Sequence, residues 1–481
     1  MRLCHEKSKE DPMKSEHYDL IAIGAGSAAR DGANKAAKDY GAKVALIEGE
    51  RWGGSCPNVA CVPTKAYLVA ADLAHSINTL ANERGIEVGP ATTNLANVKA
   101  WKDTLKKPQQ KWVEGLHAAG FDTYEGTATF VDPHTVRLGD VELKADKILI
   151  ATGSRTAVPP IEGIEEIDWV DHVSALEIEE LPERLLVCGA GAVGLEFGQA
   201  FSRFGTKVTI VDAVDEIAPH TDHHAAMELR EALTDEGIPI ILGSFVTKVA
   251  ARDGGNVATI TPREGGMEQE VEFDCFLLAS GRRPNIEELN LEAVGVETYK
   301  LGIVVDERLR TNVPGIWAAG DVNGQALFTP VAQYQARIAV EDMFHPGEGP
   351  AADYSVLPTA IFTDPELAGV GLTQSAAEEQ GFEAETVVHP LKHLRRASYI
   401  DAKHGLYKIV FDRPSRRVLG LHVVAPGASD IVQGLSIAVR LGVTVDQLAS
   451  AHHTFPTFGE GVKAAAEQAR ATAPQAVSAS P

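Results

Sequence analysis

Short apolar segments alternate with helix-like segments over the first two thirds of the chain. Residues 18–23 are largely apolar, a helix-like stretch then runs to Gly41, and residues 43–47 are largely apolar again. Short apolar runs bounded by turns are typical of buried parallel strands, and the segments between them of crossover helices. The pattern predicts an α/β lobe that begins near residue 18.

A glycine-rich turn joins the first predicted strand to the first predicted helix. Gly24 permits a tight turn, Gly26 lets the backbone approach a pyrophosphate, and Ala29 allows the helix to pack closely on the strand. The second strand ends at Glu48, whose carboxylate would accept hydrogen bonds from an adenosine ribose. Strand, turn, helix, strand and acid in this order predict a dinucleotide-binding site.

The same arrangement occurs a second time. A strand at 185–188 precedes a glycine turn at 189–194, a helix at 195–204 and a strand at 207–211 that ends in Asp212. Two complete motifs imply two bound dinucleotides. A carboxylate at Asp212 can bind the ribose hydroxyls of NAD, but it would repel the extra phosphate of NADP by about 1–4 kcal/mol. We therefore expect NADH to be preferred over NADPH at this second site.

Two cysteines, Cys56 and Cys61, follow the first motif. On a regular helix they would lie about 7.5 Å apart, beyond the usual reach of a disulfide, so a bond between them requires a tightened, irregular turn. Gly53, Gly54 and Pro57 supply suitable backbone for such a turn. The alternatives are a structural disulfide, half of a metal site or two inert thiols, but zinc-type sites usually carry a second cysteine pair and this chain has none. The pattern favours a redox-active pair, which makes the first motif the better candidate for FAD and the second for the nicotinamide donor.

The segment from Gly53 to Lys65 resembles the active-site segment of the flavin-dependent disulfide reductases, the family of glutathione reductase, dihydrolipoamide dehydrogenase and mercuric reductase. The similarity extends from about residue 18 to about residue 467. It implies an α/β fold of the glutathione-reductase type, with two Rossmann-like domains for FAD and NAD(P) and a C-terminal α+β dimerisation domain. It also implies a homodimer, a Cys61 thiolate against the flavin, and a Cys56 that attacks the substrate.

The resemblance assigns residues to each role. FAD is expected to contact Gly24, Gly26, Ser27, Ala29, Glu48, Gly54, Ser55, Lys65, Ala128, Asp321 and Thr329. NAD is expected to contact Gly189, Gly191, Val193, Gly194, Asp212, Val249 and Gly281. Catalysis is expected to depend on Cys56, Cys61, Lys65, Glu196, His453 and Glu460, with the Glu196 carboxylate paired with Lys65.

The last motif departs from the pattern of its relatives. Dihydrolipoamide dehydrogenase-like reductases carry His-x-His-Pro-Thr-x-x-Glu, in which the histidine before proline is the acid-base group and the glutamate orients it. Here Phe455 stands in place of that histidine, while the proline, threonine and Glu460 match. A phenyl ring cannot move a proton, and a positioned acid contributes roughly 10²–10⁴ in rate. Either His453 or His452 takes over this role, or the substrate needs no proton.

These observations predict an enzyme that passes hydride from NADH through FAD and the Cys56–Cys61 disulfide to a small disulfide. The first alternative is a reductase of a metal ion or a quinone, because mercuric reductase also carries Phe-Pro near its terminal motif. This chain lacks the adjacent C-terminal cysteines and the N-terminal Cys-x-x-Cys of that enzyme, which argues against dedicated mercury detoxification. The second alternative is a redox-sensing flavoprotein without turnover.

Composition narrows the partners and the compartment. Acidic residues outnumber basic ones by 67 to 44, a formal charge of −23 that argues against nucleic acid or an anionic membrane as a partner. No apolar window is long enough to cross a bilayer, and the first sixteen residues lack the apolar run of a secretion signal. Five cysteines in so long a chain fit a reducing cytoplasm. Cys188 and Cys275 lie in apolar runs and are expected to be buried small side chains.

The predicted organisation divides the chain into six segments. These are an N-terminal extension (1–16), the first part of an FAD domain (17–155), an NAD(P) domain (156–280), the second part of the FAD domain (281–350), an interface domain (351–470) and a disordered tail (471–481). Within the first part of the FAD domain, residues 66–119 follow the cysteines and are expected to be largely helical.

Overall fold

The computed structural model describes residues 15–472, so residues 1–14 of the predicted extension and 473–481 of the predicted tail lie outside the described part. The described chain forms two compact units, each built from three separate segments. The first unit contains residues 15–62, 104–155 and 282–352. The second contains residues 63–103, 156–281 and 353–472. The predicted domain limits at 155/156 and 280/281 lie close to the divisions between these segments. The assignment of the segments to FAD and NAD(P) domains remains a prediction.

The first unit is built on a parallel sheet of five strands. In spatial order these are β20 (Ile316–Ala318), β8 (Ile148–Ile150), β2 (Leu20–Ile23), β3 (Val44–Glu48) and β4 (Asp122–Glu125). Strands β2 and β8 are buried along their whole length, which explains their continuous apolar sequences. The predicted β-α-β arrangement of the first motif is therefore confirmed, with the glycine turn at the carboxyl end of the central strand.

Helices α1 (Ser27–Tyr40) and α9 (Thr329–Phe344) pack against each other and against this sheet. Small alanines on α1, including Ala29, Ala33 and Ala36, are buried there and permit the close approach. A second sheet of four strands covers another part of the unit: β1 (Ser15–Tyr18), β7 (Val141–Ala145), β6 (Thr135–Leu138) and β5 (Thr129–Asp132).

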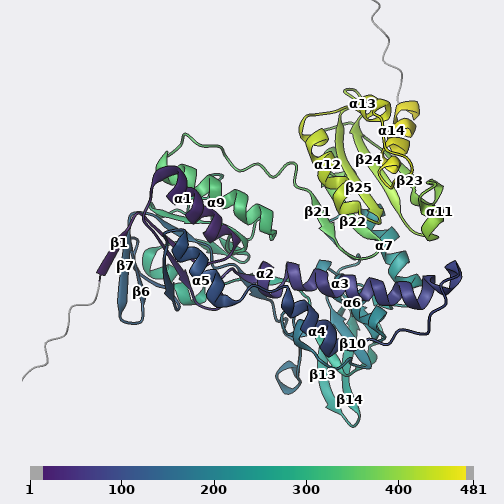
Figure 1. Ribbon diagram of the computed structural model, residues 1–481, viewed down its shortest axis with the longest axis horizontal. Helices are drawn as coiled ribbons and strands as arrows, with labels where there is room; N and C mark the ends of the chain where they lie inside the picture. The colour runs from purple at the N-terminus through teal and green to yellow at the C-terminus, as the bar shows by residue number, and fades with distance from the viewer. Residues whose placement is uncertain (1–14, 473–481) are drawn as a thin grey trace, which may run out of the picture. The chain divides into compact units, whose positions relative to one another are not determined.

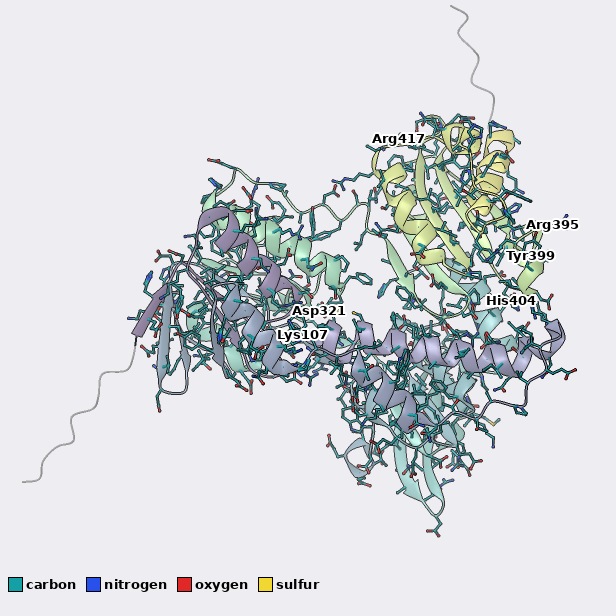
Figure 2. All side chains as sticks on the ribbon, in the orientation of Figure 1. Lys107, Asp321, Arg395, Tyr399, His404 and Arg417 are labelled. Atoms are coloured by element: carbon teal, nitrogen blue, oxygen red, sulfur yellow. The ribbon has the colours of Figure 1, made fainter. Side chains whose placement is uncertain are left out.

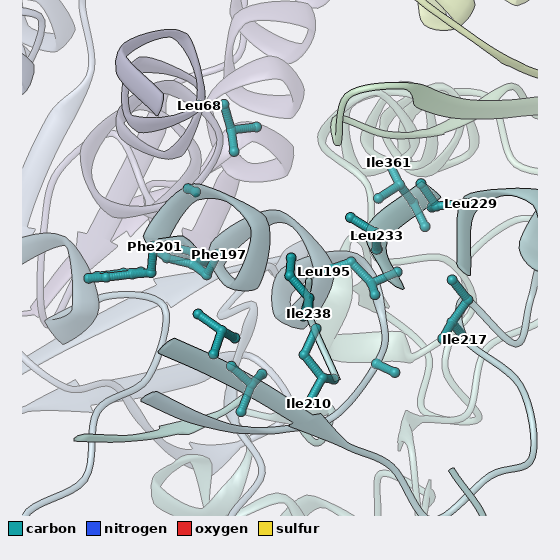
Figure 3. Packing of buried hydrophobic residues seen from close by; sticks show 14 of the residues in the cluster. Leu68, Leu195, Phe197, Phe201, Ile210, Ile217, Leu229, Leu233, Ile238 and Ile361 are labelled. Carbon is teal, nitrogen blue, oxygen red and sulfur yellow. The ribbon is translucent and has the colours of Figure 1, made fainter. Parts of the chain in front are cut away.

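The second unit repeats the arrangement around the second motif. Its parallel sheet has the order β12 (Ile240–Ile241), β11 (Lys207–Val211), β10 (Arg184–Cys188) and β16 (Cys275–Leu278). Helices α6 (Ala192–Phe204) and α7 (His223–Asp235) contribute to its core (Figure 3). An antiparallel sheet of β13 (Ser244–Arg252), β14 (Gly255–Pro262) and β15 (Gln269–Phe273) adjoins it.

Residues 353–472 complete the second unit with an antiparallel sheet of five strands (Figure 1). Helices α12 (Ala428–Arg440) and α14 (Glu460–Thr472) pack against this sheet, and α13 (Val445–Ser450) packs against α14. A buried ion pair joins Lys408 Nζ on this sheet to Asp222 Oδ2 at the start of α7, over 2.7 Å. The strands, in spatial order, are β21 (Thr359–Ile361), β22 (Glu366–Gly371), β25 (Val418–Ala425), β24 (Leu406–Asp412) and β23 (Ala384–Pro390).

The helical prediction for residues 66–119 is only partly confirmed. Helix α3 (Cys61–His75) is followed by short π and 3₁₀ turns, and helices resume only with α4 (Leu95–Thr104) and α5 (Gln109–Ala118). Gly89 and Pro90 interrupt the helical pattern, and Pro108 forms the N-cap of α5. Across residues 15–472, every helix is too short or too polar to span a bilayer.

Candidate functional site

The cysteine segment is folded into two short helical pieces in succession. Cys56 lies on α2 (Ser55–Val59) and is half-buried, whereas Cys61 begins α3 and is exposed. Ala60, between them, has φ −131° and ψ −102°, so the helix is broken at this residue, as a bond between Cys56 and Cys61 would require. The Cys61 sulfur lies 3.8 Å from the hydroxyl of Thr329, the first residue of α9.

The start of α2 packs directly on the first glycine turn. Gly54 is the N-cap of α2 and has φ +75°, and a Cβ at this position would lie 2.5 Å from the Cα of Gly26. Only glycine permits both this conformation and this contact. The cysteine helix therefore begins at the first dinucleotide motif, and Ser55 and Ser27 begin the two helices that start at this contact.

Glu48 is held at the first turn by backbone hydrogen bonds. Its Oε2 accepts from the N–H of Ala25 over 2.8 Å, and its Oε1 accepts from Glu50 and Arg51 over 2.8 and 3.1 Å. Helix α1 has Gly26 as its N-cap and no side-chain capping bond. Its first N–H groups therefore suit a pyrophosphate, and the glycine-lined turn leaves space for close approach, so these residues fit FAD.

Asp321 lies in the same unit (Figure 2) and accepts a hydrogen bond from Ser154 Oγ over 2.6 Å. The Nε of Arg282 donates to the same hydroxyl over 2.7 Å and lies 3.6 Å from Asp321 Oδ2. Ala128 is buried immediately before β5, in the core cluster that contains β2 and β3 residues. The first unit thus contains most of the predicted FAD residues and both cysteines.

The second glycine turn has the same construction. Asp212 Oδ2 accepts from the N–H of Ala190 over 2.5 Å, and Oδ1 accepts from Val214 over 3.1 Å. Gly191 is the N-cap of α6, again without a side-chain capping bond, and Val193 and Gly194 follow on the first turn of that helix. These residues fit the pyrophosphate and ribose of a second dinucleotide.

Two other predicted NAD residues lie on neighbouring segments of the second unit. Val249 lies on β13, and its N–H donates to the carbonyl of Glu162 over 2.8 Å. The carbonyl of Gly281 accepts from Ala157 over 2.9 Å. These main-chain hydrogen bonds attach β13 to the Glu162 segment and the Ala157 segment to Gly281.

Lys65 and Glu196 form the predicted pair. Lys65 Nζ lies 2.7 Å from Glu196 Oε2, and Glu196, on α6 two residues after Gly194, is only 5 % exposed. Phe362 contacts both partners, because its N–H donates to Glu196 Oε1 over 3.0 Å and its ring lies 4.3 Å from Lys65 Nζ. The arrangement restrains the lysine ammonium at a point one helical turn beyond Cys61.

In the terminal motif, His453 and Glu460 each bond to a nearby main-chain group. The Phe455 side chain at the histidine position is 68 % exposed. Glu460 Oε2 accepts from the N–H of Thr457 over 2.9 Å, within its own motif, and His453 Nδ1 lies 3.2 Å from the carbonyl oxygen of Ala451.

The other two described cysteines are in unreactive environments. Burial raises the pKa of the Cys188 thiol to about 12 and that of Cys275 to about 11. Both are half-buried and pack on apolar clusters, so they remain protonated at neutral pH. The expectation of small packing residues agrees with these surroundings.

Several residues of these sites carry no recognisable signal in the sequence. Phe362 contacts Glu196 from 166 positions away along the chain, and it is still farther from Lys65 in the sequence. Arg263, on the β14–β15 connection, donates to the carbonyl of Ala213 over 3.1 Å and pairs with Asp215. Arg30 stacks on Trp112. These contacts join distant positions at no fixed spacing, so they can be identified only from the structure.

Comparisons with known proteins agree with this architecture. Residues 18–336 match the family model "Pyridine nucleotide-disulphide oxidoreductase", and residues 357–466 match the dimerisation domain of the same family. Mercuric reductase of Staphylococcus aureus is 36 % identical, over 93 % of this chain and 82 % of that protein. Dihydrolipoyl dehydrogenase of Thermus scotoductus is 35 % identical, over 94 % of this chain and 97 % of that protein.

A solved structure shares the whole fold. The copper(II) complex of the HOCl-induced flavoprotein disulfide reductase RclA from Escherichia coli superimposes with a TM-score of 0.83 at 28 % identity, covering 94 % of this chain and 99 % of that one. The expected fold class and the resemblance to the disulfide reductases are therefore confirmed. The chain belongs to the pyridine nucleotide-disulphide oxidoreductase family, whose members are NAD(P)H-dependent flavoprotein enzymes that use FAD, and it carries the family's dimerisation domain.

Proposed function

We propose that this enzyme uses NADH to reduce a small disulfide through the Cys56–Cys61 pair. The observation that carries the proposal is the contact of Gly54 with Gly26, which begins the cysteine helix at the turn suited to FAD. The position of Cys61 beside Thr329 supports it, because α9 starts at that residue and directs its first N–H groups toward the same region.

Bound FAD would supply two-electron transfer between NADH and the cysteine pair. The Cys56 thiolate would then attack one sulfur of the substrate and release the first product thiolate. Cys61 would attack the Cys56 sulfur of the mixed disulfide, so that the second thiolate leaves and the Cys56–Cys61 bond forms again. Each leaving thiolate takes up one proton, and Lys65, held by Glu196, keeps a positive charge one turn from Cys61.

A second candidate acceptor is a soft metal ion or a quinone. Phe455 favours this alternative, because its exposed ring supplies no proton and the nearby Glu460 carboxylate is engaged by the Thr457 N–H. A metal ion bound by thiolates takes electrons without a proton from the protein. Relatives of this chain include mercuric reductases, and the structural neighbour RclA was solved with copper(II).

An acceptor screen on the purified holoenzyme separates the two candidates. NADH oxidation is followed with oxidised lipoamide, glutathione disulfide, mercuric ion and benzoquinone, in the native enzyme and in the Cys56→Ser and His453→Ala variants. A disulfide reductase should produce thiols at a rate that falls in both variants. A metal or quinone reductase should keep its rate in His453→Ala and lose it in Cys56→Ser. Absence of turnover with all four acceptors would contradict both.

We infer a preference for NADH over NADPH from the second motif. Asp212, held by the Ala190 and Val214 amides, places a carboxylate where the adenosine ribose is expected. Its negative charge would oppose a 2′-phosphate. The ratio of kcat/KM for the two nucleotides measures this preference directly.

We also infer that two copies of the chain associate through the dimerisation domain. Ile437 and Leu441, one turn apart on and just after α12, are 63 % and 75 % exposed. Large apolar side chains at this exposure are typical of a surface covered by a partner. Light scattering after size exclusion should give twice the mass of one chain, and Ile437→Asp should shift it toward the single-chain value.

A further inference from the structure

An aromatic side chain with two cations lies next to the cysteine helix. The guanidinium carbon of Arg30, on α1, is 4.5 Å from the ring centre of Trp112, on α5, and Lys107 Nζ is 4.2 Å from the same ring (Figure 2 labels Lys107). A Cβ on Gly53 would lie 2.6 Å from Cε2 of Trp112, so the indole packs directly on the glycine turn that precedes Cys56. The Arg30 guanidinium is therefore restrained close to the start of α2.

Hydrogen bonds fix the helix of Cys56 against the helix of Trp112. Asn58, on α2, is 5 % exposed and donates to the carbonyls of Trp52 and Gly54 over 3.0 and 2.7 Å. Its own oxygen accepts from Gln109, the first residue of α5, over 3.2 Å. These bonds hold the turn, α2 and α5 in one arrangement, so the distance from Trp112 to the cysteine helix is well defined.

The carboxylate next to Arg30 in the sequence forms its ion pair with another arginine. Asp31 pairs with Arg337 on α9 instead. Among the described residues no hydrogen-bond partner is placed at the buried Nε of Arg30. Burial lowers the pKa of Arg30, and attraction to Cys56 and to Asp31 acts in the opposite direction. An arginine nevertheless remains a cation at neutral pH.

The attacking cysteine needs such a cation. The thiolate is the nucleophilic form, and an unperturbed cysteine is only a few per cent thiolate at neutral pH. Nearby positive charge increases that fraction. The terminal motif of this chain carries Phe455 in place of a histidine and supplies no charge at that position.

We propose that Arg30, stacked on Trp112 beside the Gly53–Gly54 turn, is a positioning residue that holds Cys56 as a thiolate. The proposal rests on the proposed function, because it names the group that prepares Cys56 for attack on the substrate. The guanidinium acts through charge and takes no part in bond making, so a lysine at the same position should replace it in part.

The test is the pH profile of Cys56 alkylation in the holoenzyme reduced with dithiothreitol. Iodoacetamide labelling is followed by mass spectrometry, with the Cys56 and Cys61 labels distinguished by fragmentation of their common peptide. In Arg30→Leu we expect the Cys56 rate at pH 7 to fall about three- to tenfold and the midpoint of its profile to move to higher pH. Arg30→Lys should recover part of the rate. The matched control is Arg337→Leu, which removes an arginine that packs on the same helix α1, and it should leave the profile unchanged.

Two results overturn the proposal. The first is an Arg30→Leu profile that coincides with the native one, including the case in which this variant binds less FAD, because Arg30 then serves the cofactor rather than the thiol. The second is an equal loss in Arg337→Leu, which indicates general loosening of α1. Alkylation needs no NADH and no acceptor, so a failure of the proposed function, seen as absent turnover, is distinguishable from a failure of this proposal.

Discussion

The two glycine turns share a construction but differ in how closely they are packed. At the first position both have a left-handed glycine, and a Cβ on Gly24 or on Gly189 would lie 2.3 Å from a carbonyl oxygen of the neighbouring strand end, that of Ala151 or Ala279. At the third position they diverge. The first turn accommodates the methyl group of Ala29, whereas a Cβ on Gly194 would lie 1.8 Å from the carbonyl oxygen of Gly189.

This difference indicates that the third glycine is required only where the helix approaches the turn itself. In the first unit α1 leaves room for the buried methyl group of Ala29, and the next buried alanines, Ala33 and Ala36, continue the close packing. In the second unit α6 leaves no room for a methyl group at Gly194, and every residue from Leu195 to Phe201 is buried. The second turn therefore tolerates less change than the first.

The largest expected effect comes from exchanging the third residues. Gly194→Ala should slow reduction of the flavin by NADH more than 100-fold, because relieving a backbone clash of this kind costs about 3 kcal/mol. FAD should stay bound. Ala29→Gly should cost about 1 kcal/mol of stability, from helix propensity, and leave flavin reduction nearly unchanged. Stopped-flow absorbance measures the rates.

A control on the same helix separates the turn from general packing. A Cβ on Gly198 would meet the flexible end of Ile210 at 2.9 Å and make an ordinary contact with Val208 at 3.6 Å. Gly198→Ala should therefore reduce the rate less than threefold. A loss as large as that of Gly194→Ala would show that α6, and not the turn, is the sensitive element.

The second effect concerns the two acids. Glu48 accepts three backbone hydrogen bonds and Asp212 accepts two, each of the charge-assisted kind. Glu48→Ala should weaken FAD binding by about 2 kcal/mol, roughly 30-fold. Asp212→Ala should leave the flavin content unchanged and raise the KM for NADH about tenfold. The absorbance ratio at 450 and 280 nm reports FAD, and steady-state assays report KM. Loss of flavin in Asp212→Ala would contradict the assignment of the two turns.

The third comparison concerns two carboxylates at the same helical position, two residues beyond Ala29 and Gly194. Glu196 has a 6 % exposed side chain and engages Lys65 and the Phe362 N–H, whereas Asp31 pairs with Arg337, whose side chain is 63 % exposed. Glu196→Gln should slow flavin reduction about tenfold, because it leaves the lysine charge uncompensated in a partly buried setting. Asp31→Asn should change the rate less than twofold, as for most exposed ion pairs.

A double variant sharpens this third comparison. If Glu196 acts through Lys65, then Lys65→Met combined with Glu196→Gln should be no slower than Lys65→Met alone. Additive losses would assign Glu196 a role of its own, such as holding the Phe362 segment through its Oε1.

Local spacing made much of this arrangement predictable. The strand, turn, helix and acid of each motif lie within about thirty residues, and each has a distinct backbone requirement, so Gly24, Glu48, Gly189 and Asp212 could be identified from the sequence. A bond between Cys56 and Cys61 likewise requires a broken helix, and the structure breaks the helix at Ala60. By contrast, Phe362, Arg30 and Arg263 act through side-chain stacking and single carbonyl contacts between distant segments. Such contacts have no period along the chain. The helical pattern of residues 66–119 misled because Gly85, which ends the 3₁₀ turn in a left-handed conformation, Gly89-Pro90 and Pro108 divide the region.

The smallest expected effect concerns the preference for NADH over NADPH. The residues next to Asp212 in the sequence include no cation, but the fold brings Arg263 to this position from another part of the chain. Arg263 donates to the Ala213 carbonyl and is paired with Asp215, so its charge is already compensated in the native chain. Asp212→Ser should remove the repulsion of a 2′-phosphate and raise kcat/KM for NADPH about fivefold. Adding Asp215→Asn should free Arg263 to attract the phosphate and give a further gain of about twofold. Arg263→Ala in the double variant should cancel only that last gain. If the twofold step persists without the arginine, the preference depends on Asp212 alone, and the second motif discriminates the two nucleotides by repulsion without any attracting group.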